Sequence, residues 1–188
     1  MCYVAVIDEA KKFAMEMADK YLIPPFAYTA FAVKKGQEIS KRLKADENLV
    51  ALGCYLMDIE LGRAIHEGRQ DDHVKMGVET ARSFLGKFNL PEDYQEKVLN
   101  CIAAHHGQAE HTCVESEIVK NADCFKFLDP NAILIPIYYH SDRGSLHDTV
   151  NVLKAKIEEK HDLISLDTCK EEAESDYKIV KQFLDKLE

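Results

Sequence analysis

The sequence contains no apolar stretch close to the roughly 20 residues that a membrane-spanning helix needs. Its longest apolar run, residues 132–139, is short and includes Pro136. The first residues carry no basic segment ahead of a long apolar one, so no signal peptide is expected. The six cysteines include no CxxC pair, which argues against a zinc ribbon and a thioredoxin-type motif. These absences favour a reduced protein in the cytoplasm.

Common catalytic motifs are missing as well. The sequence has no GxxxxGK[ST] phosphate loop, no GxGxxG dinucleotide fingerprint and no GxSxG nucleophile elbow. It also has no internal repeat, low-complexity tract or linker. We therefore expect residues 1–188 to form a single domain, without the chemistry that these motifs support.

Positive charge is in short supply. The 24 Lys and Arg residues face 33 Asp and Glu residues, which gives a formal net charge of −9. An acidic surface disfavours non-specific binding to nucleic acids and to anionic membranes. We therefore expect neither partner. The highly charged C-terminal helices either cover the core or support a homodimer, and their pattern does not choose between the two.

Helical patterns fill most of the chain. Apolar residues recur with a period near 3.6, and no convincing period-two alternation indicates a strand. No heptad persists, so an irregular all-α bundle is favoured over a coiled coil. Asp46 is a good N-cap, Gly68 is expected to interrupt the helical pattern and Pro91 to start a helix. Helices are expected over residues 5–20, 28–44, 46–59, 74–85, 91–106, 115–128, about 146–160 and 168–187, with a short hydrophobic helix after Pro130 and a turn at 141–144.

A few polar residues stand in or beside apolar stripes. Asp58 lies in the apolar run 49–59, where burial of a carboxylate is costly unless a metal, a cation or hydrogen bonds compensate it. His73, the pair His105-His106 and Asp123 follow on other expected helices. Carboxylates and imidazoles that meet in one helical core would suit a divalent transition metal ion, namely Mn, Fe, Co, Ni or Zn. Such an ion polarises a phosphoryl oxygen and activates bound water.

The order of these residues resembles the HD-domain superfamily of metal-dependent phosphohydrolases. Residues 46–58 look like the helix that carries the His-Asp dyad of this family. The resemblance continues in three later segments and covers about residues 25–130 as a whole. These segments are His73-Val74-Lys75-Met76-Gly77, Ile102-Ala103-Ala104-His105-His106 and Glu117-Ile118-Val119-Lys120-Asn121-Ala122-Asp123. Residues 131–188 are expected to add further helices.

Two departures from the family pattern stand out. The dyad histidine maps to Met57, so that a degenerate Met-Asp pair replaces His-Asp. The first family histidine maps to Tyr28 or is absent. A thioether is a poor ligand for a hard divalent ion, and the loss of two imidazoles is expected to weaken one half of a dinuclear site.

The resemblance implies a function and a set of site residues. It assigns catalysis to Asp58 and Asp123, and metal binding to both together with His73, His105 and, more weakly, His106. Arg69, Lys75 and Lys126 are the nearest cations in sequence for a phosphate group. The implied activity is hydrolysis of a small phosphate ester or nucleotide. The alternatives are a degenerate HD-fold module that binds a ligand without catalysis, and a purely structural helical protein.

Each candidate also has a purely structural interpretation. Asp58 could be the buried ion-pair partner of Arg63 or Lys75. His73 could simply occupy the first turn of a helix. The pair His105-His106 could stabilise a helix C-terminus. Asp123 could be a buried, hydrogen-bonded carboxylate.

Overall fold

A computed structural model of the chain describes residues 3–140 and 145–187. Over these residues it contains helices and no strand, which confirms the expected all-α fold. The turn expected at residues 141–144 lies outside the described residues. The elements are α1 (Tyr3–Tyr21), α2 (Phe26–Leu43), α3 (Glu47–Leu56), α4 (Leu61–His66), the 3-10 turn η1 (Gln70–Asp72), α5 (His73–Leu85), α6 (Glu92–Ala104), α7 (Val114–Leu128), α8 (Leu134–His140), α9 (Leu146–Asp162) and α10 (Asp167–Asp185).

The helix α3 is the most deeply packed of the N-terminal helices. It begins where the Asp46 carboxylate accepts hydrogen bonds from the backbone N–H groups of Asn48 and Leu49, at 2.9 and 3.1 Å. It contacts α1, α2, α6 and α7. A Cβ at Gly53 would lie 2.8 Å from Cys101 Cβ, so only glycine permits this close approach of α3 to α6. The start of the segment that carries Asp58 is thereby fixed.

The end of α3 differs from the expectation of one helix over 46–59. The helix ends at Leu56, and α4 begins only at Leu61. Between them, the N–H of Ile59 donates to the Leu56 carbonyl at 3.2 Å, and the N–H of Leu61 donates to the Asp58 carbonyl at 3.0 Å. Such i to i−3 bonds tighten the backbone into a turn. Asp58 therefore lies in a turn rather than on a helix, and the prediction was wrong at this point.

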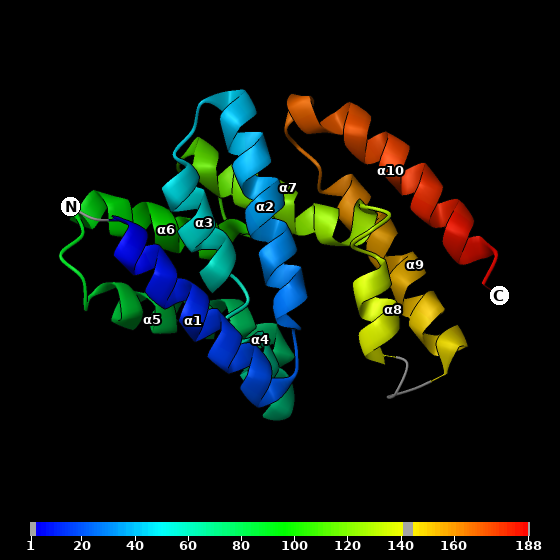
Figure 1. The fold of residues 1–188 in the computed structure, drawn as a ribbon, viewed down its shortest axis with the longest axis horizontal. Coiled ribbons are helices and arrows are strands. Elements are labelled where there is room, and N and C mark those ends of the chain that lie inside the picture. Colours follow the sequence, from blue (N-terminus) through cyan, green and yellow to red (C-terminus); the bar gives the residue numbers. More distant parts are fainter. Residues whose placement is uncertain (1–2, 141–144, 188) are drawn as a thin grey trace.

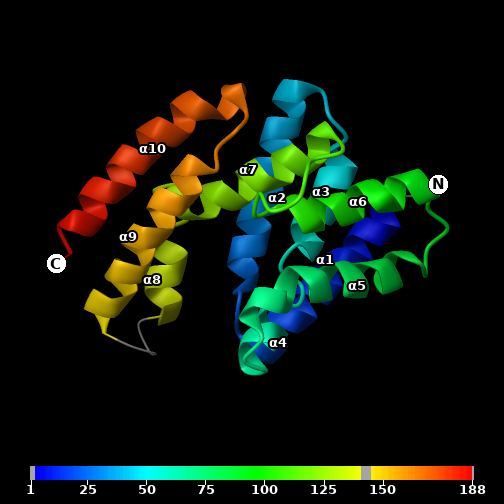
Figure 2. The same cartoon turned by 180° about the vertical axis from the view of Figure 1, so that it is seen from behind.

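The helix α7 runs through the middle of the molecule. Figures 1 and 2 show it crossing from the helices α3 and α6 to the C-terminal helices α8, α9 and α10. It contacts α2, α3 and α6 as well as α9 and α10. Most of its residues are buried, including the polar residues Asn121, Asp123 and Lys126. Buried polar groups need hydrogen-bond or ion-pair partners, so these three side chains are expected to contact polar groups of the neighbouring segments.

The C-terminal helices are tied to the rest by polar contacts. Glu172 of α10 forms ion pairs with Lys35 and Arg42 of α2, the second at 2.9 Å. The Asn121 side chain of α7 accepts hydrogen bonds from the N–H groups of Ser165 and Leu166, at 3.2 and 3.3 Å. These bonds hold the connection between α9 and α10 against α7.

The cysteines of the described chain are free thiols. Four of them are buried, as expected for reduced core residues: Cys54, Cys101, Cys124 and Cys169. Cys113 is free and partly exposed. None of the helices in the described ranges is both long and apolar enough to cross a bilayer.

One carboxylate of α10 makes stability depend on pH. Burial, together with the nearby Asp129, raises the pKa of Asp176 to about 6. The unfolded value is about 3.9, so ionised Asp176 disfavours the fold above pH 6, and this penalty disappears below about pH 4. We expect Asp176→Asn to increase the free energy of unfolding by up to about 1 kcal/mol at pH 7.5, given the partial solvent screening. The increase should vanish at pH 4.

Urea unfolding at the two pH values measures this difference. Asp19→Asn is the matched control, because Asp19 is exposed on α1. An equal effect of Asp176→Asn at both pH values would contradict the prediction.

Candidate metal centre

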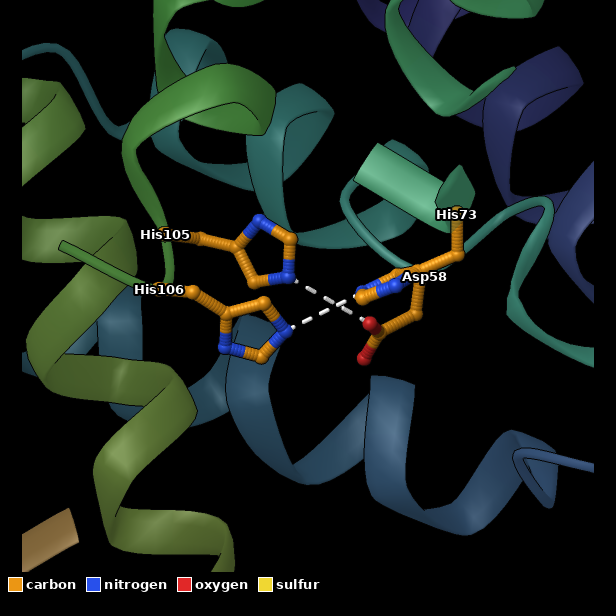
Figure 3. Close-up of side chains that lie close together, drawn as sticks. All are labelled: Asp58, His73, His105 and His106. Carbon is orange, nitrogen blue, oxygen red and sulfur yellow. Dashed lines mark hydrogen bonds and ion pairs between the residues drawn. The ribbon is translucent and has the colours of Figure 1, made fainter. Parts of the chain in front are cut away.

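Four side chains from three segments meet in one cluster. Asp58 comes from the turn after α3, His73 is the first residue of α5, and His105 and His106 follow α6. One ligand atom of each lies within 4.8 Å of the others. Figure 3 shows the two contacts within this cluster, His105 Nε2 to Asp58 Oδ1 at 3.4 Å and His73 Nε2 to His106 Nε2 at 3.1 Å.

Backbone carbonyls orient two of the imidazoles. Nδ1 of His73 lies 2.7 Å from the carbonyl of Gln70, and Nδ1 of His105 lies 2.7 Å from that of Ile102. A carbonyl can only accept, so this pattern assigns the proton to Nδ1 in both rings. In the neutral rings Nε2 then presents a lone pair to the cluster. Metal-binding histidines are commonly held in this way, with the second ring nitrogen donating to a carbonyl.

The buried Nε2 of His105 is left without a hydrogen-bond partner. The ring is fully buried, and this nitrogen faces the Asp58 carboxylate. A lone pair that faces a carboxylate oxygen is unfavourable unless a proton or a metal ion lies between them. Asp58, His73 and His105 therefore fit a divalent metal ion by donor type and by orientation.

His106 differs from the other two histidines. Its Nδ1 lies 3.2 Å from Lys160 Nζ, and an ammonium can only donate. Burial and the neighbouring His105 lower the pKa of His106 to about 3, so the ring is neutral at pH 7. The proton must then be on Nε2, which donates to His73. His106 thus brings a hydrogen-bond donor to the cluster rather than a free lone pair.

Asp123 lies beside the cluster, with both of its oxygens paired to lysines. Lys126 Nζ is 2.7 Å from Asp123 Oδ1, and Lys160 Nζ is 2.6 Å from Asp123 Oδ2. Lys126 Nζ is also 2.7 Å from Asp58 Oδ2. The Lys126 ammonium therefore bridges the two aspartates that the sequence marked as central. Asp123 matches the structural interpretation of a buried, paired carboxylate.

The charges of Asp58, Asp123, Lys126 and Lys160 determine each other's pKa values, and Asp123 also raises the pKa of Lys160. Burial alone would raise the pKa values of Asp58 and Asp123, but the Lys126 ammonium holds both well below their usual range. Burial alone would lower the pKa of Lys126, yet Asp123 and Asp58 raise it. All four groups are thus charged at neutral pH, and their formal charges cancel.

Of the three cations expected to bind phosphate, the structure brings only Lys126 to the site. Arg69 is exposed and forms ion pairs with Glu67 and Asp72. Lys75 is exposed on α5. Among the described residues, neither lines the cavity next to Asp58.

The ion-pair partners first considered for Asp58 lie elsewhere. Arg63 pairs with Glu60 at 3.2 Å and with Glu67 at 3.3 Å, so it does not neutralise Asp58. Lys126 takes that place, although it is distant in sequence.

Sequence reasoning missed Lys160. It is fully buried on α9, a helix that is otherwise rich in exposed charge. Its position continues the buried stripe formed by Val150, Leu153 and Ile157. A lysine at the next position of an apolar stripe was the available signal, because such a lysine needs a buried carboxylate as partner.

A cavity of about 440 Å³ lies beside Asp58, which lines it, whereas the three histidines of the cluster do not. Asp58, Tyr28 and Lys126 line it, so Tyr28 faces the cavity as well as packing against Phe127 at 5.5 Å between ring centroids. The buried Tyr28 hydroxyl has no hydrogen-bond partner. Most of the remaining wall is apolar, including Pro24, Leu61, Phe127, Val152 and Leu153. Cavities of this size and character commonly bind small organic ligands.

Comparison with known proteins identifies the class to which this fold and this cluster belong. The family model "HD domain" matches residues 30–128, more than half of the chain, and the chain therefore belongs to the HD-domain family. A ribonuclease Y from Finegoldia magna is 37% identical over 94 residues, which cover 50% of this chain and 16% of that protein. The chain thus spans only a small part of the length of this relative.

Solved structures show the same fold. A predicted HD-superfamily hydrolase from an uncultured Thermotogales bacterium superposes with a TM-score of 0.71 at 20% identity, over 95% of this chain and 89% of the other. An HD-superfamily hydrolase from Bacillus thuringiensis gives a TM-score of 0.70 at 18% identity, over 98% and 95% of the two chains. The C-terminal helices therefore belong to the shared architecture, beyond the segment that the family model matches.

The bridging ammonium should be essential for stability. Lys126→Met leaves two buried carboxylates facing each other without their shared cation, and loss of one partner of a buried ion pair costs about 3–5 kcal/mol. Lys126→Met combined with Asp123→Asn removes one charge of each sign and should recover part of this loss. Urea unfolding at pH 7.5 measures both.

Lys156→Met provides the matched control. Lys156 is partly exposed on α9 and pairs with Glu159, so its replacement should change stability by less than about 1 kcal/mol. Equal stabilities of Lys126→Met and Lys156→Met would contradict the importance of the bridge.

Proposed function

We propose that the chain is a metal-dependent phosphohydrolase of the HD family that acts on a small phosphate ester or nucleotide. The observation that supports this most directly is the convergence of Asp58, His73 and His105, with the buried Nε2 of His105 unpartnered. A divalent Mn, Fe, Co, Ni or Zn ion bound by these three side chains would polarise a phosphoryl oxygen and activate water.

The residues around this centre have supporting roles. Lys126 orients the Asp58 carboxylate through Oδ2 and leaves Oδ1 turned toward His105. An ion that took the lone pair of His73 Nε2 would release the Nε2–H of His106 from its bond to His73, and this N–H would then be a donor for a phosphoryl oxygen. Lys126 lines the cavity and is the proposed contact for an anionic group there, in addition to its ion pairs with Asp58 and Asp123. Asp123 acts by holding Lys126 and Lys160 in place.

We also propose that Met57 replaces the dyad histidine of the family. Met57 directly precedes Asp58 and is buried in the hydrophobic core. Its thioether is a poor ligand for these ions, so the centre has to rely on His73 and His105. This substitution also favours the alternative, an HD-fold module that binds a ligand without turnover.

A small substrate is favoured over RNA. The name of the ribonuclease Y relatives points to RNA, but the match covers only 16% of the Finegoldia magna protein. The net charge of −9 disfavours a polyanion. The cavity of about 440 Å³ suits a single small molecule, and its apolar wall suits an aromatic or aliphatic group attached to the phosphate.

Metal content tests the centre itself. Protein purified without a histidine tag and incubated with Mn²⁺ should retain about one ion per chain after desalting, as measured by elemental analysis. His105→Gln and Asp58→Asn should each reduce metal affinity at least about tenfold, because each removes one of only three ligands.

His66→Gln is the matched control for this measurement. His66 is exposed at the end of α4 and is not part of the cluster, so its replacement should leave the metal content unchanged. A folded His105→Gln protein with the metal content of the wild type would rule out the proposed centre.

Phosphate release tests the activity and the class of substrate. Aryl phosphates and nucleoside monophosphates should be hydrolysed in a metal-dependent reaction that Asp58→Asn abolishes, and an RNA oligonucleotide should remain intact. Val152→Asp places a charge in the apolar wall and should raise KM about tenfold, equivalent to about 1.4 kcal/mol of binding. Ile179→Asp is the control, because Ile179 is an exposed apolar residue of α10 that does not line the cavity.

The other outcomes separate the alternatives. Cleavage of RNA but not of small esters would reject the proposed substrate. Ligand-induced thermal stabilisation without any phosphate release would favour the module without catalysis.

A further inference from the structure

Two buried lysines contact Asp123, one at each oxygen of its carboxylate. Lys126 Nζ contacts one oxygen of Asp123 and one of Asp58, both at 2.7 Å. Lys160 Nζ contacts the other oxygen of Asp123 at 2.6 Å and His106 Nδ1 at 3.2 Å. Each positive charge is thus held by a carboxylate together with a second side chain of the site.

The depth of these ammonium groups requires an explanation. The side chains of Lys126 and Lys160 are 5% and 0% exposed, whereas lysines normally keep their charge in water. Burial of an ammonium is costly unless its partners surround it closely. Two such groups from separate helices, α7 and α9, converge on one carboxylate. This arrangement is a built cation site in which the cations belong to the chain itself.

We propose that Lys126 and Lys160 supply, as fixed ammonium groups, the positive charge that Asp123 would otherwise obtain from a metal ion. Asp123 is then not a metal ligand, and the site takes a single divalent ion, at Asp58, His73 and His105. The proposal of a single ion rests on the metal centre proposed above. The role of the lysines at Asp123 can be tested separately.

The inference has a measurable consequence. With a neutral side chain at position 126, Asp58 Oδ2 and Asp123 Oδ1 lose their shared partner and face the space that Nζ had occupied. Two carboxylate oxygens around one such space suit a hard divalent cation. Lys126→Met should therefore gain a cation site that the wild type lacks.

Metal counting on three proteins provides the test. Wild type, Lys126→Met and Lys156→Met are saturated with Mn²⁺ and desalted, and bound Mn is measured by elemental analysis and by electron paramagnetic resonance. We expect about one ion for wild type, about two for Lys126→Met and about one for the control. Two ions in Lys126→Met should also give the resonance of a magnetically coupled pair, which a single ion does not.

The outcomes separate this inference from the proposed function. Two ions in the wild type would overturn the inference but keep the metal centre. A folded Lys126→Met protein with no more metal than the wild type would also overturn it. No ion in the wild type but one in Lys126→Met would support the role of the lysines and overturn the metal centre proposed above.

A second variant covers the case in which Lys126→Met does not fold. Lys126→Met with Asp123→Asn keeps the charges balanced and should retain the metal content of the wild type, because Asp123 is not a ligand in this proposal. Loss of metal from the folded double variant would overturn the inference.

Discussion

The structure depends on the Lys126 ammonium held between the carboxylates of Asp58 and Asp123. This contact joins the turn after α3 to α7, the helix that touches both the N-terminal and the C-terminal helices. Without a cation, two buried carboxylates repel each other and take up protons. The bridge therefore keeps both charged, and it fixes the orientation of Asp58. With Oδ2 of Asp58 bound to Lys126, Oδ1 is left facing His105, and this orientation brings Asp58 into the cluster with the histidines.

Local rules of the sequence predicted most of the fold. Asp46 caps α3 as expected, and Gly68 breaks the chain in a left-handed conformation with φ of 69°, which glycine adopts without strain. The error lay between Leu56 and Leu61, where an expected helix is a turn. Apolar periodicity does not distinguish the two there, because both bury the same side chains. The turn accompanies a tertiary contact, the ion pair of Asp58 with Lys126, which lies 68 residues further along the chain.

The order of motifs predicted a site of Asp58, His73, His105, Asp123 and, more weakly, His106. Asp58 and the three histidines lie together in the structure, and Asp123 lies beside them, paired with two lysines. The motifs did not predict what neutralises Asp123. Sequence proximity suggested Arg69, Lys75 and Lys126 as cations for a phosphate group. Arg69 and Lys75 are exposed and only Lys126 reaches the site, since nearness along a chain does not determine the direction of a side chain. Lys160 was overlooked because charge on an amphipathic helix normally faces water. The apolar stripe of α9 indicates that this position faces the core, but the carboxylate that pairs with Lys160 comes from α7, which the pattern of α9 does not identify.

An ammonium and a divalent ion are different solutions to the same electrostatic problem. A lysine is present at any metal concentration, carries one charge and only donates hydrogen bonds, whereas a metal ion carries two charges and accepts ligand lone pairs. Lysines at Asp123 therefore keep that part of the site neutral and folded without metal, but they contribute no Lewis acid there. In the proposed hydrolase, catalysis would then come from the part of the site where His105 Nε2 is unpartnered. If that centre binds no ion, the balanced charges of the two lysines and the two aspartates still hold the turn after α3, α7 and α9 together, as the alternative of a module without catalysis requires.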